Sequence, residues 1–220
     1  MDALRQQLSL SDPFISENGG GIFFPKESCE NPPPSATLDG DYWKWSIGLP
    51  YNQLVKGLHK IREELGWDMQ GLSDMTAEKV SHLTGLDMET SRLAVQREFD
   101  EPFIFSGDQA RLSTLVASIE EMGFRYAEGR ICHILGDSDK GKAVDILTNL
   151  YQRKFGKIVT IALGDSPVDF SMLEKVDHPV LVRNYKGEHD RRIALPNLIK
   201  VEGIGPKGWN KAVPALIEDR

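Results

Sequence analysis

Residues 158–173, IVTIALGDSPVDFSML, give the strongest indication of the fold class of this protein. The first six of them are apolar or β-branched at both odd and even positions, which predicts a strand covered on both faces. A turn of small residues follows, and it carries two carboxylates, Asp165 and Asp169, four positions apart. Ligands of an open parallel sheet bind beyond the carboxyl ends of the strands, where this turn lies. The stretch therefore predicts an α/β fold with a site for a cation or a phosphate.

The segments around this stretch alternate between helix and strand patterns. Apolar residues recur at helical spacing over 140–155, and Gly156 follows at the position of a C-terminal cap. The apolar runs at 179–184 and 198–203 predict two further strands. Alternation of this kind implies a parallel sheet with flanking helices.

The N-terminal residues fit the same layer. Residues 2–8 resemble the last turns of a helix, and 13–20 resemble a strand that runs into a glycine turn. Residues 20–25 then predict half of a hairpin. The stretch 27–41 is rich in proline and turn formers, which indicates a loop at a domain boundary.

The pattern changes between about residues 41 and 133. Two amphipathic helices are predicted there, over 52–65 and 108–123. Short strands are predicted at 42–48, 103–107, 124–129 and 130–135. We interpret 41–133 as an α+β module inserted into a doubly wound core made of 1–40 and 134–220.

Composition narrows the class of protein. With 220 residues, of which 40% are hydrophobic, the chain can bury a core. The net charge of −7, without any long basic run, makes nucleic acid an unlikely partner. No apolar run approaches the roughly 18 residues that span a bilayer, and the N-terminus lacks the pattern of a secretory signal. We expect a cytoplasmic protein in which Cys29 and Cys132 are reduced, partly buried thiols. The oligomeric state is not predicted, because the sequence shows no exposed apolar seam distinct from the predicted core.

Asp165 and Asp169 suit Mg²⁺, which takes one or two protein carboxylates and keeps several waters or phosphate oxygens. A helix is predicted to begin near Pro167, because proline is favoured in the first turn of a helix. The alternative is structural: Asp165 caps the helix and Asp169 lies in its first turn.

Two other segments offer phosphate ligands. Lys140 lies just before a helix whose N-terminal amides attract anions, although a lysine there is more often a solvated surface residue. Lys142 competes for this role from a position further into the helix. Asn18 and Gly19 lie in a glycine turn at another strand end, where the backbone can approach a ligand closely. The alternative is that these glycines serve only to form the turn.

Taken together, these segments resemble a known family. The stretches PFISENGGGIFFP, HILGDSDKGKAVDIL, ALGDSPVDFSMLEKVDHPVLVRN and EGIGPKGW are similar, in order and spacing, to the mannosyl-3-phosphoglycerate phosphatases of the haloacid dehalogenase superfamily. The resemblance runs essentially along the whole chain. It implies a Rossmann-like core with a type C2 cap inserted after the third core strand, a sugar phosphate substrate, and a place in mannosylglycerate biosynthesis.

The resemblance also implies roles for individual residues. Lys140 neutralises the phosphate and the nucleophile, Asp165 ligates Mg²⁺ directly, and Asp169 holds the metal waters. The small-residue turn adds Ser166, and Asn18 and Gly19 lie beside the transferred phosphoryl group. In the cap, QREFDEPF resembles a segment that contacts the sugar or glycerate, which makes Arg97 and Glu98 candidates; the alternative is a surface ion pair.

The sequence departs from the family in two ways. The family's nucleophile and its general acid and base are aspartates of a DxDGT segment, which these 220 residues do not contain. The resemblance implies that roughly the first 45 to 50 residues of the family are missing, so that the core is incomplete and the chain poorly stable and inactive alone. Val168 also stands where the family has an asparagine, and because valine cannot hydrogen-bond, the change fits either weaker metal binding or relaxed selection on the site.

Three interpretations follow. The first is a phosphatase for mannosyl-3-phosphoglycerate with its nucleophile encoded upstream of Met1, by truncation of the gene model. The second is a non-catalytic descendant that binds a sugar phosphate or serves in an interaction. The third is a related phosphatase for another sugar phosphate, because the core motifs report the reaction and not the leaving group.

Overall fold

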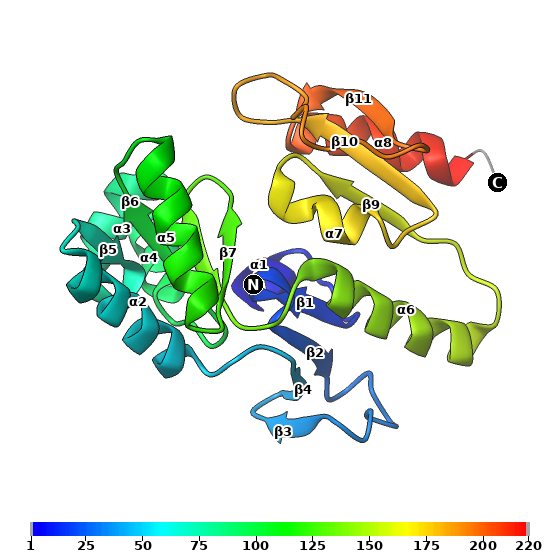
Figure 1. The fold of residues 1–220 in the computed structure, drawn as a ribbon. Helices are drawn as coiled ribbons and strands as arrows, with labels where there is room; N and C mark the ends of the chain where they lie inside the picture. Colours follow the sequence, from blue (N-terminus) through cyan, green and yellow to red (C-terminus); the bar gives the residue numbers. More distant parts are fainter. Residues whose placement is uncertain (1, 219–220) are drawn as a thin grey trace. The chain divides into compact units, whose positions relative to one another are not determined.

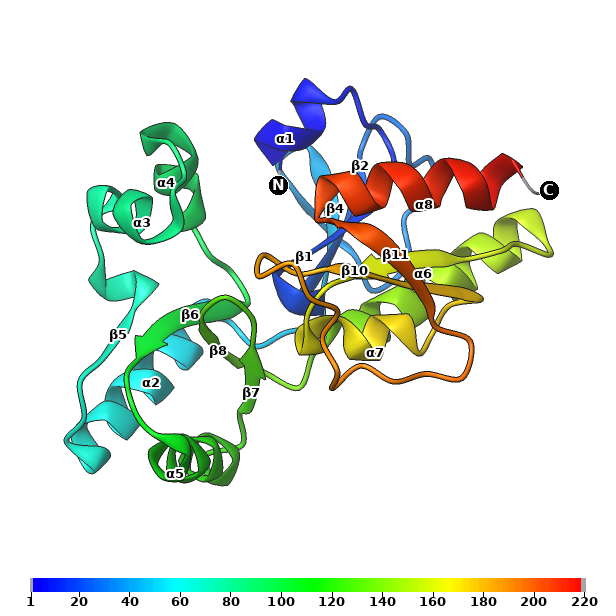
Figure 2. The same ribbon diagram turned by 90° about the horizontal axis from the view of Figure 1, so that it is seen from above.

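The computed structural model describes residues 2–218 and consists of two compact units, 1–138 and 139–220 (Figures 1 and 2). Both units contain strands and helices, as expected of an α/β protein. Each unit has its own hydrophobic clusters and its own sheets.

The first sheet of the unit 1–138 is antiparallel, with strand order β1-β2-β4-β3. Its strands are β1 (Phe14–Ser16), β2 (Gly21–Pro25), β3 (Thr37–Asp39) and β4 (Tyr42–Ser46), preceded by α1 (Asp2–Gln7). The short 3-10 helix η1 (Glu17–Gly19) makes the turn between β1 and β2, so the predicted hairpin is confirmed. The predicted loop 27–41 is wrong at its end, because β3 forms there by pairing with β4.

The pairing of β4 with β2 bears on the domain division. The sequence assigns β4 to the inserted module, whereas its neighbour β2 lies in the segment assigned to the core. The boundaries at residues 41 and 133 therefore stay a prediction.

The second sheet of this unit, also antiparallel, has the order β5-β6-β8-β7. Its strands are β5 (Met69–Gly71), β6 (Asp100–Phe105), β7 (Arg125–Glu128) and β8 (Cys132–Leu135). The helices are α2 (Tyr51–Leu65), α3 (Ala77–Thr84), α4 (Met88–Ala94) and α5 (Gln109–Glu121), with the 3-10 turn η2 (Leu72–Asp74). The long helices α2 and α5 lie against the sheet (Figure 2) and bury the apolar faces that their sequences predict. The centre of this core is formed by Leu54, Leu58, Ile61, Phe103, Leu115, Ile119 and Ile134.

The unit 139–220 is built on a parallel sheet with strand order β11-β10-β9. Its elements are α6 (Lys140–Phe155), β9 (Ile161–Gly164), η3 (Pro167–Asp169), α7 (Phe170–Leu173), β10 (His178–Arg183), β11 (Ile199–Ile204) and α8 (Pro206–Glu218). Helix α6 ends at Gly156, whose φ of +76° lies in the left-handed region that glycine tolerates.

Both faces of this sheet are covered, as its sequence predicts. Ala162 and Leu181 pack with Leu173 of α7, whereas Val180 and Val182 pack with Ala212 of α8. Neighbouring residues of β10 thus face opposite layers of helix. The N-terminal strand is predicted to join this layer. That prediction is wrong for the pairing of the strand, because β1 forms its hydrogen bonds with β2 in a separate, antiparallel sheet.

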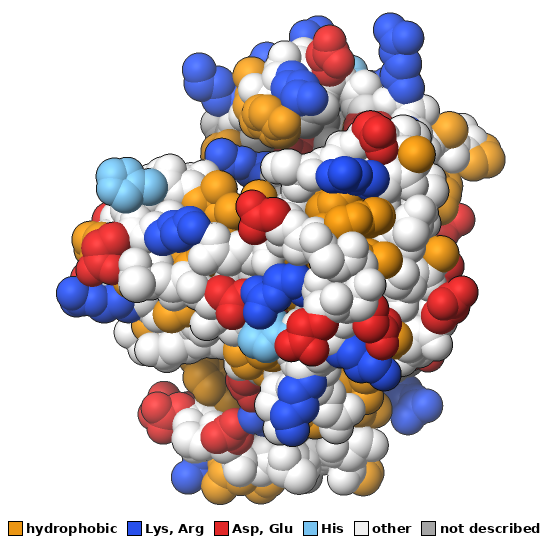
Figure 3. All heavy atoms as spheres, turned by 60° about the vertical axis from the view of Figure 1, so that its left-hand side comes forward, with side chains coloured by type: hydrophobic (Ala, Val, Ile, Leu, Met, Phe, Trp, Pro, Cys, Tyr) orange, Lys and Arg blue, Asp and Glu red, His pale blue; other side chains and the backbone are white. Residues whose placement is uncertain are grey.

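Acidic and basic side chains are interspersed over the face drawn in Figure 3. Within residues 2–218, no helix is long and apolar enough to cross a membrane. Cys29 and Cys132 are free, half-buried thiols, as expected.

Candidate functional site

The turn that follows β9 folds by local rules. Residues Gly164–Asp169, which we call the acidic turn, lead from the end of β9 into η3. Ser166 is the N-cap of η3 and Pro167 begins it, while Asp169 completes a capping box with Ser166. The structural alternative from the sequence made Asp165 the cap of this helix. In the structure, Ser166 and Asp169 form the cap instead.

Asp169 is the hub of the acidic turn. Its Oδ2 accepts hydrogen bonds from the backbone N–H of Asp165 at 3.0 Å, from the N–H of Ser166 at 3.2 Å and from Oγ of Ser166 at 3.1 Å. Its Oδ1 accepts from Nζ of Lys140 at 2.6 Å. A carboxylate with this many donors is held in one position, and its charge is balanced by the lysine.

Lys140 reaches Asp169 because the start of α6 lies against α7. Asp139 caps α6 by accepting from the N–H of Lys142, and the N–H of Gly141 donates to Oγ of Ser171 at 3.2 Å. A Cβ on Gly141 would lie 2.3 Å from the backbone oxygen of Ser171, so only glycine permits this approach. Of the two lysines that the sequence offers, Lys140 contacts the acidic turn through Asp169.

Glycine is also required at the start of the turn. A Cβ on Gly164 would lie 2.5 Å from Cβ of Asp169, in space that the aspartate occupies. The sequence Gly164-Asp165-Ser166 thus combines close packing, a carboxylate and a cap in three residues.

Asp165 is the carboxylate of this turn that stays least compensated. It is half-buried, and burial raises its pKa, as does the negative charge of Asp169. Asp165 and Asp169 together carry one negative charge more than Lys140 balances. This surplus on oxygen ligands fits a hard divalent cation such as Mg²⁺.

The protein provides few ligands for such a cation. Across residues 2–218, no group of three or more His, Cys, Asp and Glu residues is placed to hold a metal. Two carboxylates are nevertheless enough for Mg²⁺, which keeps several waters or binds phosphate oxygens instead. Val168 lies in η3, and its side chain has no hydrogen-bonding group to offer.

The remaining candidates from the sequence lie in the unit 1–138. Asn18 and Gly19 belong to η1, and the amide Nδ2 of Asn18 donates to Oδ2 of Asp100 at 3.0 Å. Arg97 donates from Nη2 to the same oxygen at 2.6 Å. Glu98 accepts instead from Lys44 at 2.5 Å. Arg97 and Glu98 therefore pair with different residues, and the alternative interpretation of an ion pair between the two is wrong.

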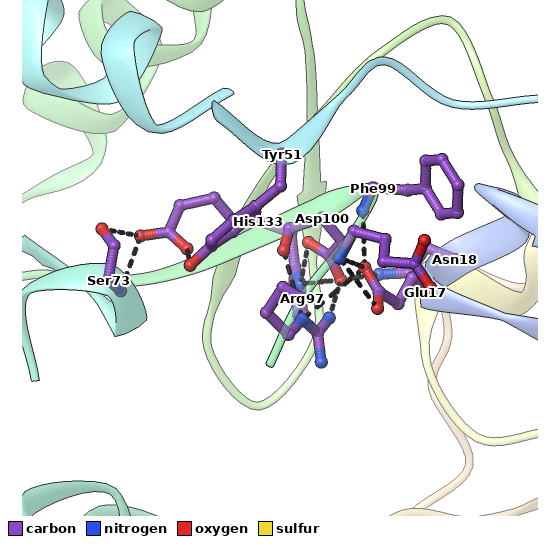
Figure 4. A network of polar contacts seen from close by, with 10 residues as sticks. Glu17, Asn18, Tyr51, Ser73, Arg97, Phe99, Asp100 and His133 are labelled. Carbon is purple, nitrogen blue, oxygen red and sulfur yellow. Dashed lines mark hydrogen bonds and ion pairs between the residues drawn. The ribbon is translucent and has the colours of Figure 1, made fainter. Parts of the chain in front are cut away.

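Sequence reasoning missed several polar residues of this region (Figure 4). Asp100, with an exposed fraction of 1%, also lies 3.0 Å from Nδ1 of His133. Its neighbour Glu101 is fully buried and accepts from the hydroxyls of Tyr51 and Ser73 at 2.5 and 2.6 Å. Burial raises the pKa of Glu101, which has only neutral donors. Two adjacent acids inside an otherwise apolar strand were the signal available in the sequence.

The structure thus brings the predicted site residues together in two groups, each within one unit. Lys140, Asp165, Ser166 and Asp169 meet at the acidic turn. Asn18 and Arg97 meet at Asp100, with Gly19 adjacent in the chain.

Similar proteins are known. The sequence is 42% identical over 218 residues to the glucosyl-3-phosphoglycerate/mannosyl-3-phosphoglycerate phosphatase of Methanococcoides burtonii, an alignment that covers 99% of this chain and 80% of that protein. A protein of the same name from Persephonella marina is 31% identical over 228 residues, with 100% and 81% covered. No protein-family model matches the sequence.

A solved structure shares the fold. The structure of a sugar phosphatase of HAD subclass IIB superimposes with a TM-score of 0.60 at 15% identity, covering 97% of this chain and 79% of that one.

Proposed function

This chain belongs to the glucosyl-3-phosphoglycerate/mannosyl-3-phosphoglycerate phosphatases of the haloacid dehalogenase superfamily, and we propose that it acts with Mg²⁺ on mannosyl-3-phosphoglycerate. Its relatives are phosphatases, and hence hydrolases of phosphate esters. The product of the proposed reaction is mannosylglycerate. A hexosyl-3-phosphoglycerate with glucose in place of mannose is the nearest alternative substrate, as the names of the relatives indicate.

The contact between Lys140 and Asp169 beside Asp165 carries this proposal. In the proposed reaction, the ammonium of Lys140 binds the phosphate, and Asp169 fixes the direction of that ammonium. Asp165 holds the metal, while Asp169 holds the acidic turn and the metal waters. Bound Mg²⁺ supplies charge stabilisation to a transferring phosphoryl group. The hydroxyl of Ser166, which the capping box orients, lies beside the same anion.

The attacking group is the open part of the proposal. These enzymes use an aspartate of a DxDGT segment, and the 220 residues contain none. We therefore assign the phosphate-binding and metal-binding roles to this chain and assign the role of nucleophile to none of these 220 residues.

Phosphate release tests the proposal. The substrates are mannosyl-3-phosphoglycerate, glucosyl-3-phosphoglycerate and mannose 6-phosphate, each with Mg²⁺. We assay the 220-residue chain and the same chain extended by the codons that precede Met1 in its gene. We expect release only from the extended chain, and fastest from a hexosyl-3-phosphoglycerate.

Each other outcome contradicts a specific part. Equal rates on all three substrates would overturn the substrate assignment. Release by the 220-residue chain would show that a carboxylate within it attacks the phosphorus. No release by either chain would favour the second candidate, a sugar-phosphate-binding descendant without catalysis.

A further inference from the structure

The parallel sheet of the unit 139–220 ends in a strand with one free side. In the strand order β11-β10-β9, β11 has β10 on one side and no strand of residues 2–218 on the other (Figure 1). The N–H and C=O groups on the free side of an edge strand can pair with a further strand. β11 therefore offers a row of backbone groups to a partner.

The pairing of β10 shows which groups of β11 face outward. The N–H of His178 donates to the oxygen of Thr160, just before β9, at 3.0 Å. Backbone groups of successive residues in a strand point to opposite sides, so those of Leu181 face β11, where Lys200 is its partner in the register. In a parallel pair, a residue bonds to the two neighbours of its partner and not to the partner itself. The N–H and C=O of Lys200 therefore point to the free side.

The next outward groups follow from the same geometry. The C=O of Val201 faces β10, and because the peptide bond is trans, the N–H of Glu202 points to the free side. The side chain of Val201 packs in the cluster that includes Ala212 of α8. The side chains of Lys200 and Glu202 lie on the opposite face of the sheet, and both are exposed. The edge thus presents a base and an acid two positions apart, beside outward backbone groups.

The charges of this edge are complementary to those of a second copy. When two β11 strands pair in antiparallel fashion about a two-fold axis at Val201, Lys200 lies opposite Glu202 of the partner subunit, and the axis repeats this pair. An axis at Lys200 would instead place two lysines opposite each other, and an axis at Glu202 would do the same with two acids. Of these three arrangements, the one centred on Val201 joins opposite charges, which stabilise a pair of strands.

The same arrangement matches backbone groups and an apolar side chain. The N–H of each Glu202 meets the C=O of Lys200 of the partner subunit, which gives two hydrogen bonds related by the axis. Ile204, with an exposed fraction of 48%, ends β11 and thus lies near the start of the strand in the other copy, which follows a half-buried Leu198. Pairing would remove apolar surface from water at both ends of the strands.

The ion pairs of the chain leave Lys200 available for such a partner. Glu202 pairs with Arg183, whereas Lys200 has no ion pair with another residue of 2–218. A lysine on an edge strand often prevents pairing with other chains, and this is the structural alternative for Lys200. Against a second copy this protection fails, because an acid lies opposite the lysine.

We propose that β11 is an interface between two copies of this chain, in which an antiparallel pair of β11 strands centred on Val201 joins the two parallel sheets. The joined sheet has six strands, three from each copy. The inference does not depend on the proposed function, because it involves neither the acidic turn nor a ligand.

Analytical ultracentrifugation of the 220-residue chain over a range of concentrations tests the inference. We expect a concentration-dependent dimer for the wild type. Lys200→Glu and Glu202→Lys should each raise the dissociation constant of the dimer by about tenfold or more, because both cross-strand pairs then join like charges. An equimolar mixture of the two variants should restore the dimer, since one chain carries acids at both positions and the other carries bases.

Lys157→Glu is the matched control. It makes the same change of charge on an exposed lysine between α6 and β9, and it should leave the dissociation constant unchanged. Because Glu202→Lys also removes the pair with Arg183, urea unfolding of each variant at low concentration shows that the fold is retained. Hydrogen exchange adds a local measurement: the N–H of Glu202 should exchange more slowly at high concentration in the wild type, but not in Lys200→Glu.

The other outcomes overturn the inference in different ways. A wild type that stays monomeric at every concentration would leave Lys200 as the charge that protects the edge. A dimer that neither charge reversal weakens would place the interface elsewhere, for example at β9, the other edge strand of this sheet. Loss of the dimer in both variants without recovery in their mixture would contradict the pairing of Lys200 with Glu202 across the axis.

Discussion

The acidic turn and the group around Asp100, which comprises Glu17, Asn18, Arg97 and His133, each hold two carboxylates against one lysine or arginine, but the carboxylates are compensated differently. At the acidic turn, Asp169 takes the lysine and three further donors, which leaves Asp165 short of compensation. Around Asp100, the extra carboxylate belongs to Glu17, and two backbone N–H groups satisfy it. The first arrangement leaves one carboxylate available to a cation, whereas in the second both carboxylates have donors.

The difference shows that counting charges does not identify a ligand. The number of donors on each carboxylate decides whether its charge is available, because a carboxylate held by N–H groups gains little from a further cation. Four experiments test this contrast.

Removal of the charge on Asp165 should have the largest effect. In the chain that releases phosphate, Asp165→Asn should lower turnover by about 100-fold or more, because a metal ligand is lost. Mg²⁺ should also raise the melting temperature of the wild type and not that of the variant. Lys157→Ala, an exposed change, should leave both measurements unchanged. A Mg²⁺ response retained by Asp165→Asn would show that the metal is held elsewhere.

Removal of the side chain of Asp169 or of Asp100 should destabilise the folded protein. Asp169→Ala and Asp100→Ala should each lower the free energy of unfolding by about 2–4 kcal/mol, because several donors lose a buried acceptor. Urea titration measures the effect, with the exposed Asp68→Ala as the control. A loss below about 0.5 kcal/mol at either position, the range of ordinary surface changes, would mean that the donors find other partners.

Gly20→Ala tests the packing beneath the group around Asp100. The new methyl group collides with Phe99, and we expect a loss of about 1–3 kcal/mol from overpacking. Gly129→Ala is the matched control, since its Cβ would have no atom closer than 3.6 Å. Equal effects of the two changes on the midpoint of urea unfolding would rule out the steric explanation.

Glu101→Gln should have the smallest effect and should depend on pH. Because the pKa of Glu101 is raised in the folded protein, protonation of this carboxyl group favours folding. Its contribution to the free energy of unfolding therefore declines as pH rises through that pKa. Tyr51, Ser73 and Asp100 are the groups around it, and none of them is a cation. The stability of the variant relative to the wild type should increase between pH 4 and pH 7, as measured by unfolding at each pH. A constant difference would place the titration elsewhere.

The two regions also differ in how far the sequence predicts them. The acidic turn follows from a strand, a small-residue turn and a capping pattern within one short stretch, and α6 from its apolar spacing. The group around Asp100 joins residues up to 115 positions apart, so only the chain topology brings them together. For the same reason β3 was missed: its residues lie in a stretch rich in turn formers, and its partner β4 supplies the pairing.

The close approach of α6 and α7 at Gly141 has a consequence for ligand binding. The helix that starts with Lys140 touches the helix that follows Asp169, and a hydrogen bond from Gly141 to Ser171 joins them. The ammonium and its carboxylate are therefore preorganised: an anion bound as proposed would meet a cation whose conformational entropy has already been lost during folding. Affinity at this turn should then be limited by displacement of water and not by ordering of the chain.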